Sequence, residues 1–169
     1  NRRQIKKNEI LHVPSSVKKL DFPIMSHLRM IVFSKKCSVE DLGPPRMFSY
    51  YNLIEITIPK LVQSISPFLF EHCHFLRTVR FEEGSVLKEI GEYSFSNTRV
   101  RQVELPPSVQ IIHKAAFSNN LDLKEVTFEG ETIEEEAFSQ TGLVKFLLSN
   151  NTKTIGDKAF LFCHSLTTF

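Results

Sequence analysis

The hydrophobic positions of this chain recur in columns whose successive members are 20 to 25 residues apart. The first column is aliphatic: Leu20, Leu42, Ile65, Ile90, Ile112, Ile133 and Ile155. A second column follows five or six residues later and is always phenylalanine: Phe48, Phe70, Phe95, Phe117, Phe138 and Phe160. Further columns have the form L-x-x-V-x-F, as in "LKEVTF" over residues 123–128. This spacing indicates a repeat protein.

The L-x-x-V-x-F segment alternates apolar and polar residues at its end, which is typical of a short, half-buried strand. One strand per unit, always running in the same direction, predicts a parallel ladder with strands about 4.8 Å apart. The stretch before each Phe, such as "IGEYSF", is too short for a regular α-helix and predicts a single helical or 3-10 turn. Because one unit cannot bury its own apolar face, stacked units must share a continuous core.

The repeat predicts a single domain of about seven units. We expect the boundaries 11–33, 34–58, 59–81, 82–105, 106–128, 129–148 and 149–169, after a basic segment over residues 1–10. The predicted fold class is a β-rich α/β solenoid: a right-handed leucine-rich-repeat coil with a parallel sheet of one strand per repeat and short helical or 3-10 turns on the return path. Because the chain stops at Phe169 inside an expected strand, we expect a fragment or an uncapped end, with end-to-end self-association as a further expectation.

Two stretches, "LPPSVQIIHKAAFSNNLDLKEVTF" and "TIGDKAFLFCHSLTTF", resemble the BspA-like leucine-rich repeats, also called the Treponema pallidum type. The residues that carry the resemblance are Pro106, Ser108, Val109, Ile112, Ala116, Phe117, Ile155, Gly156, Ala159, Phe160, Cys163 and Leu166. The unit that begins at residue 129 departs from the pattern, because Gly130 stands where an aliphatic residue is expected.

The resemblance implies a cell-surface or secreted protein, as found in bacteria and parasitic protists. It implies a non-catalytic binding module of an adhesin, with a host matrix protein, another cell-surface protein or an acidic glycan as partner. The alternative is a cytoplasmic scaffold that docks a regulatory or catalytic partner. A signal peptide or anchor in the full-length protein would favour the first function, and a fused catalytic domain would favour the second.

Composition narrows the classes of partner and chemistry. A net charge of +2 is too small to argue for nucleic acid, and no apolar run approaches the length of a membrane span. The chain has no GxSxG, HExxH, P-loop or GxGxxG motif, so we predict no enzyme activity, cofactor or metal. Basic residues crowd the N-terminus, and we interpret them as a solvated end rather than a polyanion-binding arm: Arg2, Arg3, Lys6 and Lys7.

The sequence "FEHCHF" over residues 70–75 raises the question of a metal or nucleophile site. The same Cys-His pair recurs four units later at residues 163–164, roughly 19 Å away at the spacing of parallel strands. A disulfide needs Cα atoms within about 7 Å, so neither a disulfide nor a shared metal is expected. Cys73 occupies the same place in its unit as Asn120 and Thr98, which favours a structural role in satisfying the backbone of a turn.

The turn after each Phe alternates between five and six residues, which indicates that a pair of units is the true repeat. The third residue after Phe alternates with it: Tyr51, Cys73, Thr98, Asn120, Thr141 and Cys163.

A run of five glutamates within residues 129–136 could provide paired carboxylates for acid–base chemistry. We interpret it instead as a solvated edge at a helical start.

The variable strand positions are expected to face outward on the concave side of the solenoid, where such proteins bind partners. A basic stripe there consists of Arg77, Arg101 and Lys124 in three adjacent units. The candidate ligand-binding face is Arg77, Arg80, Arg101, Lys124, Glu55, Gln102, Glu104, Glu125 and Lys145. These charges either solvate the surface or bind an acidic protein patch or sulfated glycan.

Overall fold

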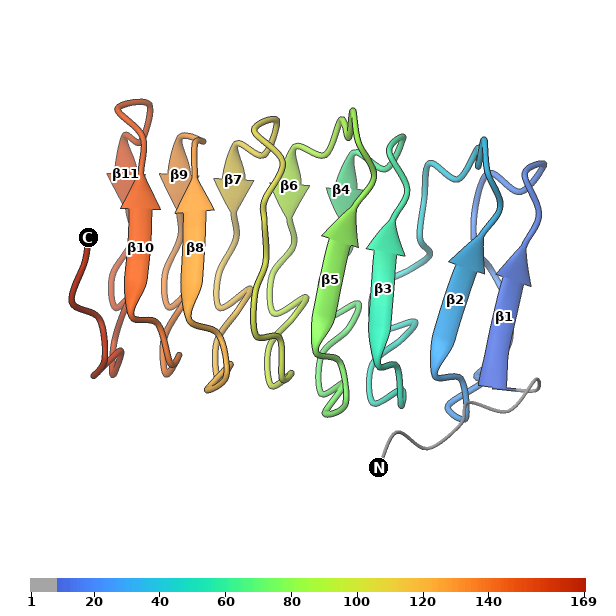
Figure 1. Cartoon of the computed structure of the whole chain (residues 1–169), viewed down its shortest axis with the longest axis horizontal. Helices are drawn as coiled ribbons and strands as arrows, with labels where there is room; N and C mark the ends of the chain where they lie inside the picture. The colour runs from blue at the N-terminus through green and yellow to red at the C-terminus, as the bar shows by residue number, and fades with distance from the viewer. Residues whose placement is uncertain (1–8) are drawn as a thin grey trace.

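The computed structural model describes residues 9–169, which wind into a single row of stacked coils (Figure 1). Each coil passes through a front row of strands and then through a rear row before the next coil begins. The parallel-strand solenoid and its repeat, predicted from the hydrophobic columns, are confirmed. The four basic residues near the N-terminus lie outside the described residues.

The front row is made of four-residue strands: β1 (Ile10–Val13), β2 (Met30–Phe33), β3 (Glu55–Ile58), β5 (Thr78–Phe81), β8 (Glu125–Phe128) and β10 (Lys145–Leu148). They form a four-stranded parallel sheet in the order β1-β2-β3-β5 and a separate pair of β10 with β8. Their inward side chains come from the predicted columns, so Ile56 pairs with Val79 and Val126 pairs with Phe146 in the core. The strand β1 extends the row beyond the columns identified in the sequence.

The front row is interrupted at the coil of residues 82–105, where the sequence predicted a strand over residues 100–105. That strand is absent, and a single bridge between Thr78 and Gln102 joins this coil to β5. Val103 nevertheless remains buried, with 2% of its surface exposed. The coil therefore keeps its core side chain in place while its backbone leaves the ladder between β5 and β8 (Figure 1).

The rear row was not predicted. It consists of two-residue strands: β4 (Ser64–Ile65), β6 (Glu89–Ile90), β7 (Ile111–Ile112), β9 (Thr132–Ile133) and β11 (Thr154–Ile155). They form a five-stranded parallel sheet in the order β11-β9-β7-β6-β4. The expected helical turns are hydrogen-bonded turns, and no α-helix occurs within residues 9–169. The aliphatic column of the sequence thus forms a second ladder that closes the coil opposite the front strands.

The phenylalanine column forms a continuous stack through the core. Rings of neighbouring coils lie 5.2–5.6 Å apart between centroids and within 4–14° of parallel, from Phe48 through to Phe160. Every ring from Phe48 to Phe138 is fully buried. This stack confirms the spine expected from the sequence, in which each ring belongs to two interfaces between coils.

A third set of backbone hydrogen bonds joins the coils around this stack. Each Phe is flanked, two residues before and two after, by a residue with positive φ, such as Tyr93 (51°) and Asn97 (55°) around Phe95. The amides of these three residues donate to carbonyls of the next coil at 2.8–3.0 Å. The turns are therefore bonded between coils as regularly as the strands are.

Two pairs of residues in the turn column are hydrogen-bonded across neighbouring coils. Asn120 is fully buried, and its Nδ2 donates to the carbonyl oxygens of Phe95 (2.7 Å) and Phe117 (2.9 Å). The hydroxyl of Thr98, in the preceding coil, donates to the same Phe95 carbonyl and to Asn120 Oδ1. Thr141 and Cys163 are coupled in the same way, 3.1 Å apart. In these two pairs the short-turn residue bonds the long-turn residue of the next coil, whereas the Tyr51 hydroxyl accepts from the Met25 amide at 2.6 Å.

The structural role predicted for Cys73 is confirmed by its contacts. Its Sγ donates to the carbonyl oxygen of Phe48 in the preceding coil at 3.0 Å. Burial raises the pKa of the Cys73 thiol to about 12, although a backbone hydrogen bond with Tyr51 acts in the opposite direction. Cys37, Cys73 and Cys163 are all free thiols.

Cys73 is expected to resist alkylation by iodoacetamide in the folded protein at pH 8, because the thiolate is the reactive form and almost none is present four pH units below the pKa. The half-buried Cys163 should be modified first. Peptide mass spectrometry over a time course measures both rates. Labelling of Cys73 as fast as Cys163 would contradict this assignment, and unfolding in urea should make the two thiols equally reactive.

Candidate functional site

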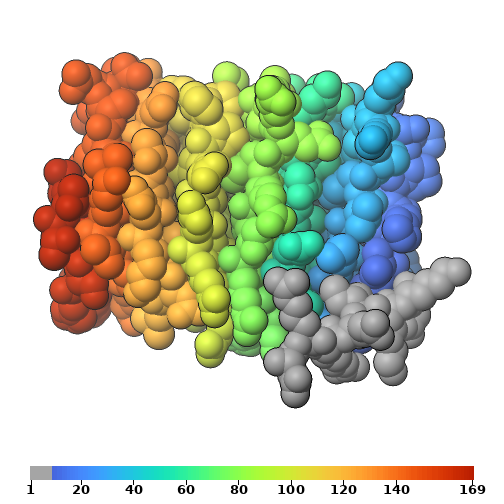
Figure 2. Space-filling view, viewed as in Figure 1, coloured from blue at the N-terminus to red at the C-terminus, as the bar shows by residue number. Residues whose placement is uncertain are grey.

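The outward side chains of the front strands form a charged face, which we call the strand face. Figure 2 shows this face with the coils as parallel bands across it. The nine predicted residues all lie here, and all are exposed except the half-buried Glu55 and Lys145. The structure therefore brings the predicted set onto one surface.

Several of these charges are neutralised by neighbours in adjacent coils. Arg80 on β5 pairs with Glu55 on β3 at 3.4 Å, and Lys145 on β10 pairs with Glu125 on β8 at 2.6 Å. The Lys145–Glu125 pair joins residues directly opposite in the ladder, which is where cross-strand charges stabilise a sheet. These four residues serve the stacking of coils, a role that the sequence did not separate from binding.

The basic stripe of Arg77, Arg101 and Lys124 is continuous across three coils. The amide of Arg101 donates to the Arg77 carbonyl, and the amide of Lys124 donates to the Arg101 carbonyl, each at 3.2 Å. Lys124 Nζ donates to the carbonyl of Gly142 at 3.3 Å. Within residues 9–169, neither guanidinium of Arg77 or Arg101 has a hydrogen bond or an ion-pair partner. The stripe therefore carries two uncompensated positive charges side by side.

A hollow with a volume of about 450 Å³ lies on this face where the front row is interrupted. Its lining, which defines the strand-face hollow, is Arg77, Thr78, Val79, Arg80, Phe81, Arg101, Gln102 and Glu104. The side chain of Gln102 donates to Glu104 at 3.4 Å. Both unpaired arginines, Arg77 and Arg101, border the hollow.

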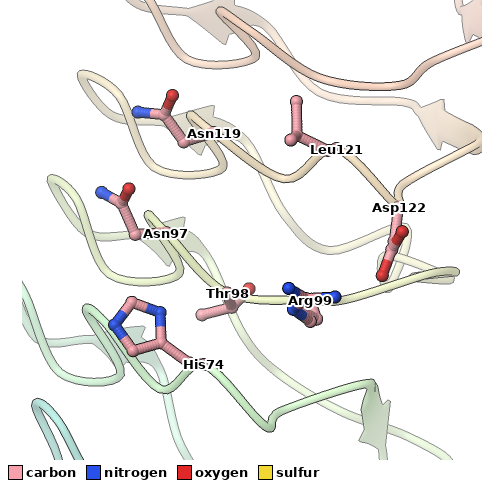
Figure 3. Close-up of a pocket in the computed structure, with 7 residues that line it drawn as sticks. All are labelled: His74, Asn97, Thr98, Arg99, Asn119, Leu121 and Asp122. Carbon is pink, nitrogen blue, oxygen red and sulfur yellow. The ribbon is translucent and has the colours of Figure 1, made fainter.

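A second hollow, of about 210 Å³, lies at the edge where the turns lead into the front strands. Its lining, which defines the turn-edge hollow, is His74, Asn97, Thr98, Arg99, Asn119, Leu121 and Asp122 (Figure 3). This hollow was not predicted from the sequence. The available signal was that these residues fall just before the L-x-x-V-x-F segment in three successive units and that most of them are polar.

The acidic run singled out in the sequence has structural partners. In the acidic run over residues 129–136, Glu135 pairs with Lys114 at 2.7 Å, and Glu134 lies 3.1 Å from His113. The hydrogen bond from Lys114 and then its charge lower the pKa of Glu135. This run extends from the bend before β9 through β9 to the start of the following turn, and the helical start that was expected is not there. No three His, Cys, Asp or Glu side chains within residues 9–169 are grouped to hold a metal ion.

Comparison with known proteins identifies the repeat. The BspA-type leucine-rich repeat region, in six copies, matches residues 44–167. No curated protein matches the chain in sequence. A search for membrane spans found, within residues 9–169, no helix long and apolar enough to cross a bilayer.

Solved structures of similar fold come from bacteria. A leucine-rich cell surface protein from Faecalibacterium prausnitzii has a TM-score of 0.56 and 18% identity over 94% of this chain and 59% of that one. The pneumococcal vaccine antigen PcpA has a TM-score of 0.48 and 17% identity, covering 88% of this chain and 58% of that one. A leucine-rich repeat protein from Bacteroides ovatus has a TM-score of 0.36 and 19% identity, covering 95% and 66%.

The chain thus spans 58–66% of the lengths of these structures, and at such identities the likeness concerns the fold alone. The family match is broader evidence, because it covers most of the chain and coincides with the observed coils. The stacked phenylalanines and the paired turn residues occupy positions that recur from one repeat unit to the next. The chain belongs to the family of BspA-type leucine-rich repeat proteins.

Proposed function

We propose that this chain is a non-catalytic binding module of a cell-surface or secreted protein, and that its strand face binds an acidic protein patch or a sulfated glycan. The observation that carries the proposal is the pair of unpaired guanidinium groups, Arg77 and Arg101, beside the strand-face hollow. Arginine is well suited to such ligands, because its planar fork of donors matches carboxylate and sulfate oxygens.

The surrounding charges favour an anionic ligand at this place. Arg80 and Lys145 already have carboxylate partners, so an incoming anion gains little from them. Arg77 and Arg101 have none, so binding there neutralises charge without first breaking an ion pair. The hollow adds concave surface, and the inner faces of solenoid proteins are commonly used for binding.

The family and the structural likeness support a place at the cell surface. The Faecalibacterium protein that shares this fold is described as a cell surface protein. A surface or secreted location would place the strand face in contact with extracellular proteins and glycans. We therefore include a host matrix protein, another cell-surface protein and an acidic glycan among the proposed partners.

Reversing the charge of the two arginines of the stripe is expected to weaken binding strongly. In surface plasmon resonance against a panel of purified matrix proteins and sulfated glycans, the chain should bind at least one member with an affinity that falls as salt rises. The variant Arg77→Glu/Arg101→Glu should weaken that binding by at least about a hundredfold, since each lost charge-assisted bond costs about 1.5–3 kcal/mol.

The matched control reverses two lysines away from the strand face. Lys18 and Lys88 are exposed, and neither side chain has a partner within residues 9–169. The variant Lys18→Glu/Lys88→Glu makes the same change of net charge and should retain binding within a few-fold. An equal loss in both variants would mean that net charge, not the strand face, governs the interaction, and would refute the proposal.

A further inference from the structure

We infer that the turn-edge hollow is a second binding site, which accepts one sugar unit that carries a carboxylate. This inference does not depend on the proposed function of the strand face. The two hollows share no lining residue, so variants can test them separately.

The turn-edge hollow is built by three successive coils. His74 comes from the first, Asn97 and Arg99 from the second, and Asn119 and Asp122 from the third (Figure 3). Its floor is fixed, because the buried Thr98 hydroxyl is bonded to the Phe95 carbonyl at 3.1 Å. The site therefore exists only in the stacked solenoid and rests on its most regular part, the turn ladder.

The polar side chains around this hollow have hydrogen-bonding capacity that the protein does not use. Within residues 9–169, the side chains of His74, Arg99, Asn119 and Asp122 have no hydrogen-bond or ion-pair partner. Asn97 donates from Nδ2 to Ser96 at 2.9 Å, which leaves its carbonyl oxygen free. Donors and acceptors of both charged and neutral kinds thus face one small space.

These residue types match the groups of an acidic sugar. The unpaired Arg99 guanidinium can bind a carboxylate through two parallel hydrogen bonds. The amides of Asn97 and Asn119 and the Asp122 carboxylate can donate to or accept from hydroxyl groups. Leu121, with 70% of its surface exposed, offers an apolar contact to the C–H face of the ring.

Size and arrangement favour a sugar over a peptide. A volume of about 210 Å³ is below the roughly 300–1,000 Å³ of sites for drug-sized ligands, so the hollow suits a single ring. An amino acid could pair its ammonium with Asp122 and its carboxylate with Arg99. It would leave the two amides on the other side of the hollow (Figure 3) without partners, whereas the hydroxyls of a sugar reach both.

The test is a titration monitored by ¹H–¹⁵N correlation spectra of the labelled chain. The probes are the methyl glycosides of glucuronic acid and N-acetylneuraminic acid, with methyl glucoside as the neutral match and leucine as the zwitterion. At least one acidic probe should give saturable shifts of the amides of residues 97–99 and 119–122. Methyl glucoside should bind at least about tenfold more weakly, because it lacks the charge-assisted bond.

Variants then locate the site. Arg99→Gln should weaken binding of the acidic probe by at least about tenfold, and Lys88→Gln, which removes one positive charge from an exposed side chain that lines neither hollow, should leave it unchanged. Asn119→Gly should also weaken binding, since glycine keeps the left-handed backbone (φ 58°) but removes the amide. The inference is overturned if neither acidic probe gives saturable shifts, if the glucoside binds equally, if leucine alone binds, or if Arg99→Gln has no effect.

Discussion

Replacing Phe117 with alanine is expected to lower the free energy of unfolding by about 3–5 kcal/mol, the usual cost of truncating a fully buried phenylalanine. The Phe117 ring stacks on Phe95 and on Phe138, with centroids 5.3 Å away on both sides. The ring is fully buried, so its loss leaves a cavity in the middle of the row. Urea unfolding followed by circular dichroism measures the change.

Because of the position of Phe117, its truncation should destabilise a larger part of the protein than a single cavity in a globular core would. Each coil is stabilised mainly by its two neighbours, and the lost ring belongs to both interfaces. Amide hydrogen exchange should therefore show faster exchange in the coils on either side, from residue 82 to residue 148. An unchanged exchange rate in either neighbouring coil would contradict the stacked spine.

Phe75→Ala is the matched control for Phe117→Ala. Phe75 is the same residue type but 46% exposed, and its notable contact is the Arg29 guanidinium, 5.5 Å from the ring centroid. We expect this variant to change the free energy of unfolding by less than about 1 kcal/mol. A similar loss in both variants would mean that phenylalanine content, rather than the stack, determines stability.

The columns of the sequence predicted the spine and most of the front strands because burial recurs at a fixed period. Phe117 and its equivalents from Phe48 to Phe138 are buried, as are Val126 and its equivalents from Ile31 to Phe146, so hydrophobicity alone identifies them. The rear strands could not be predicted in this way. A strand of two residues, such as β7, has no alternation to detect, and its pairing depends on coils already stacked by the front strands and the spine.

The interruption of the front row of strands after Gln102 was not predicted for a different reason. The segment over residues 100–105 has the same apolar pattern as its neighbours, and Val103 is buried whether or not the backbone joins the ladder. Hydrophobic pattern reports the inward side chain, not the backbone hydrogen bonds. The strand-face hollow, which is lined in part by Gln102 and Glu104 of this segment, was therefore not predicted from the sequence, although its arginines were.

The sequence also could not show which charged residues of neighbouring coils form ion pairs at the candidate site. The period placed Arg77, Arg80 and Arg101 on one face, but it did not show that Glu55 neutralises Arg80 while Arg77 and Arg101 stay unpaired. Those pairings depend on side-chain direction in neighbouring coils. The sequence thus identified the surface, and the structure separated the charges that hold coils together from those available to a ligand.

Replacing Asn120 with alanine is expected to lower the free energy of unfolding by about 3–5 kcal/mol, although the change removes only a few polar atoms. Asn120 Nδ2 bonds the carbonyls of Phe95 and Phe117, and Oδ1 accepts from the Val100 amide at 3.3 Å. All these groups lie in the core, and each buried group left without a partner costs about 1–3 kcal/mol. Urea unfolding again gives the measurement.

The repeat itself supplies the conservative variant. Cysteine occupies the equivalent place in two other long turns, where Cys73 and Cys163 each bond the phenylalanine carbonyl of the preceding coil. Asn120→Cys should therefore keep the bond to Phe95 and cost less than Asn120→Ala. If the two variants were equally destabilised, the loss would come from packing rather than from the carbonyl that the turn residue satisfies.

A double-mutant cycle with Thr98 tests whether the pair of coils is the energetic unit. The Thr98 hydroxyl donates to Asn120 Oδ1 across the interface between their coils, so Thr98→Val and Asn120→Ala should show a coupling of about 0.5–3 kcal/mol. Thr141 also lies in a short turn and donates to the carbonyl of Phe138 in its own coil, but its side-chain partner in the following coil is Cys163. Thr141→Val should therefore be additive with Asn120→Ala. Equal coupling of Asn120 to both threonines would show that the coils stack as identical single units and not as pairs.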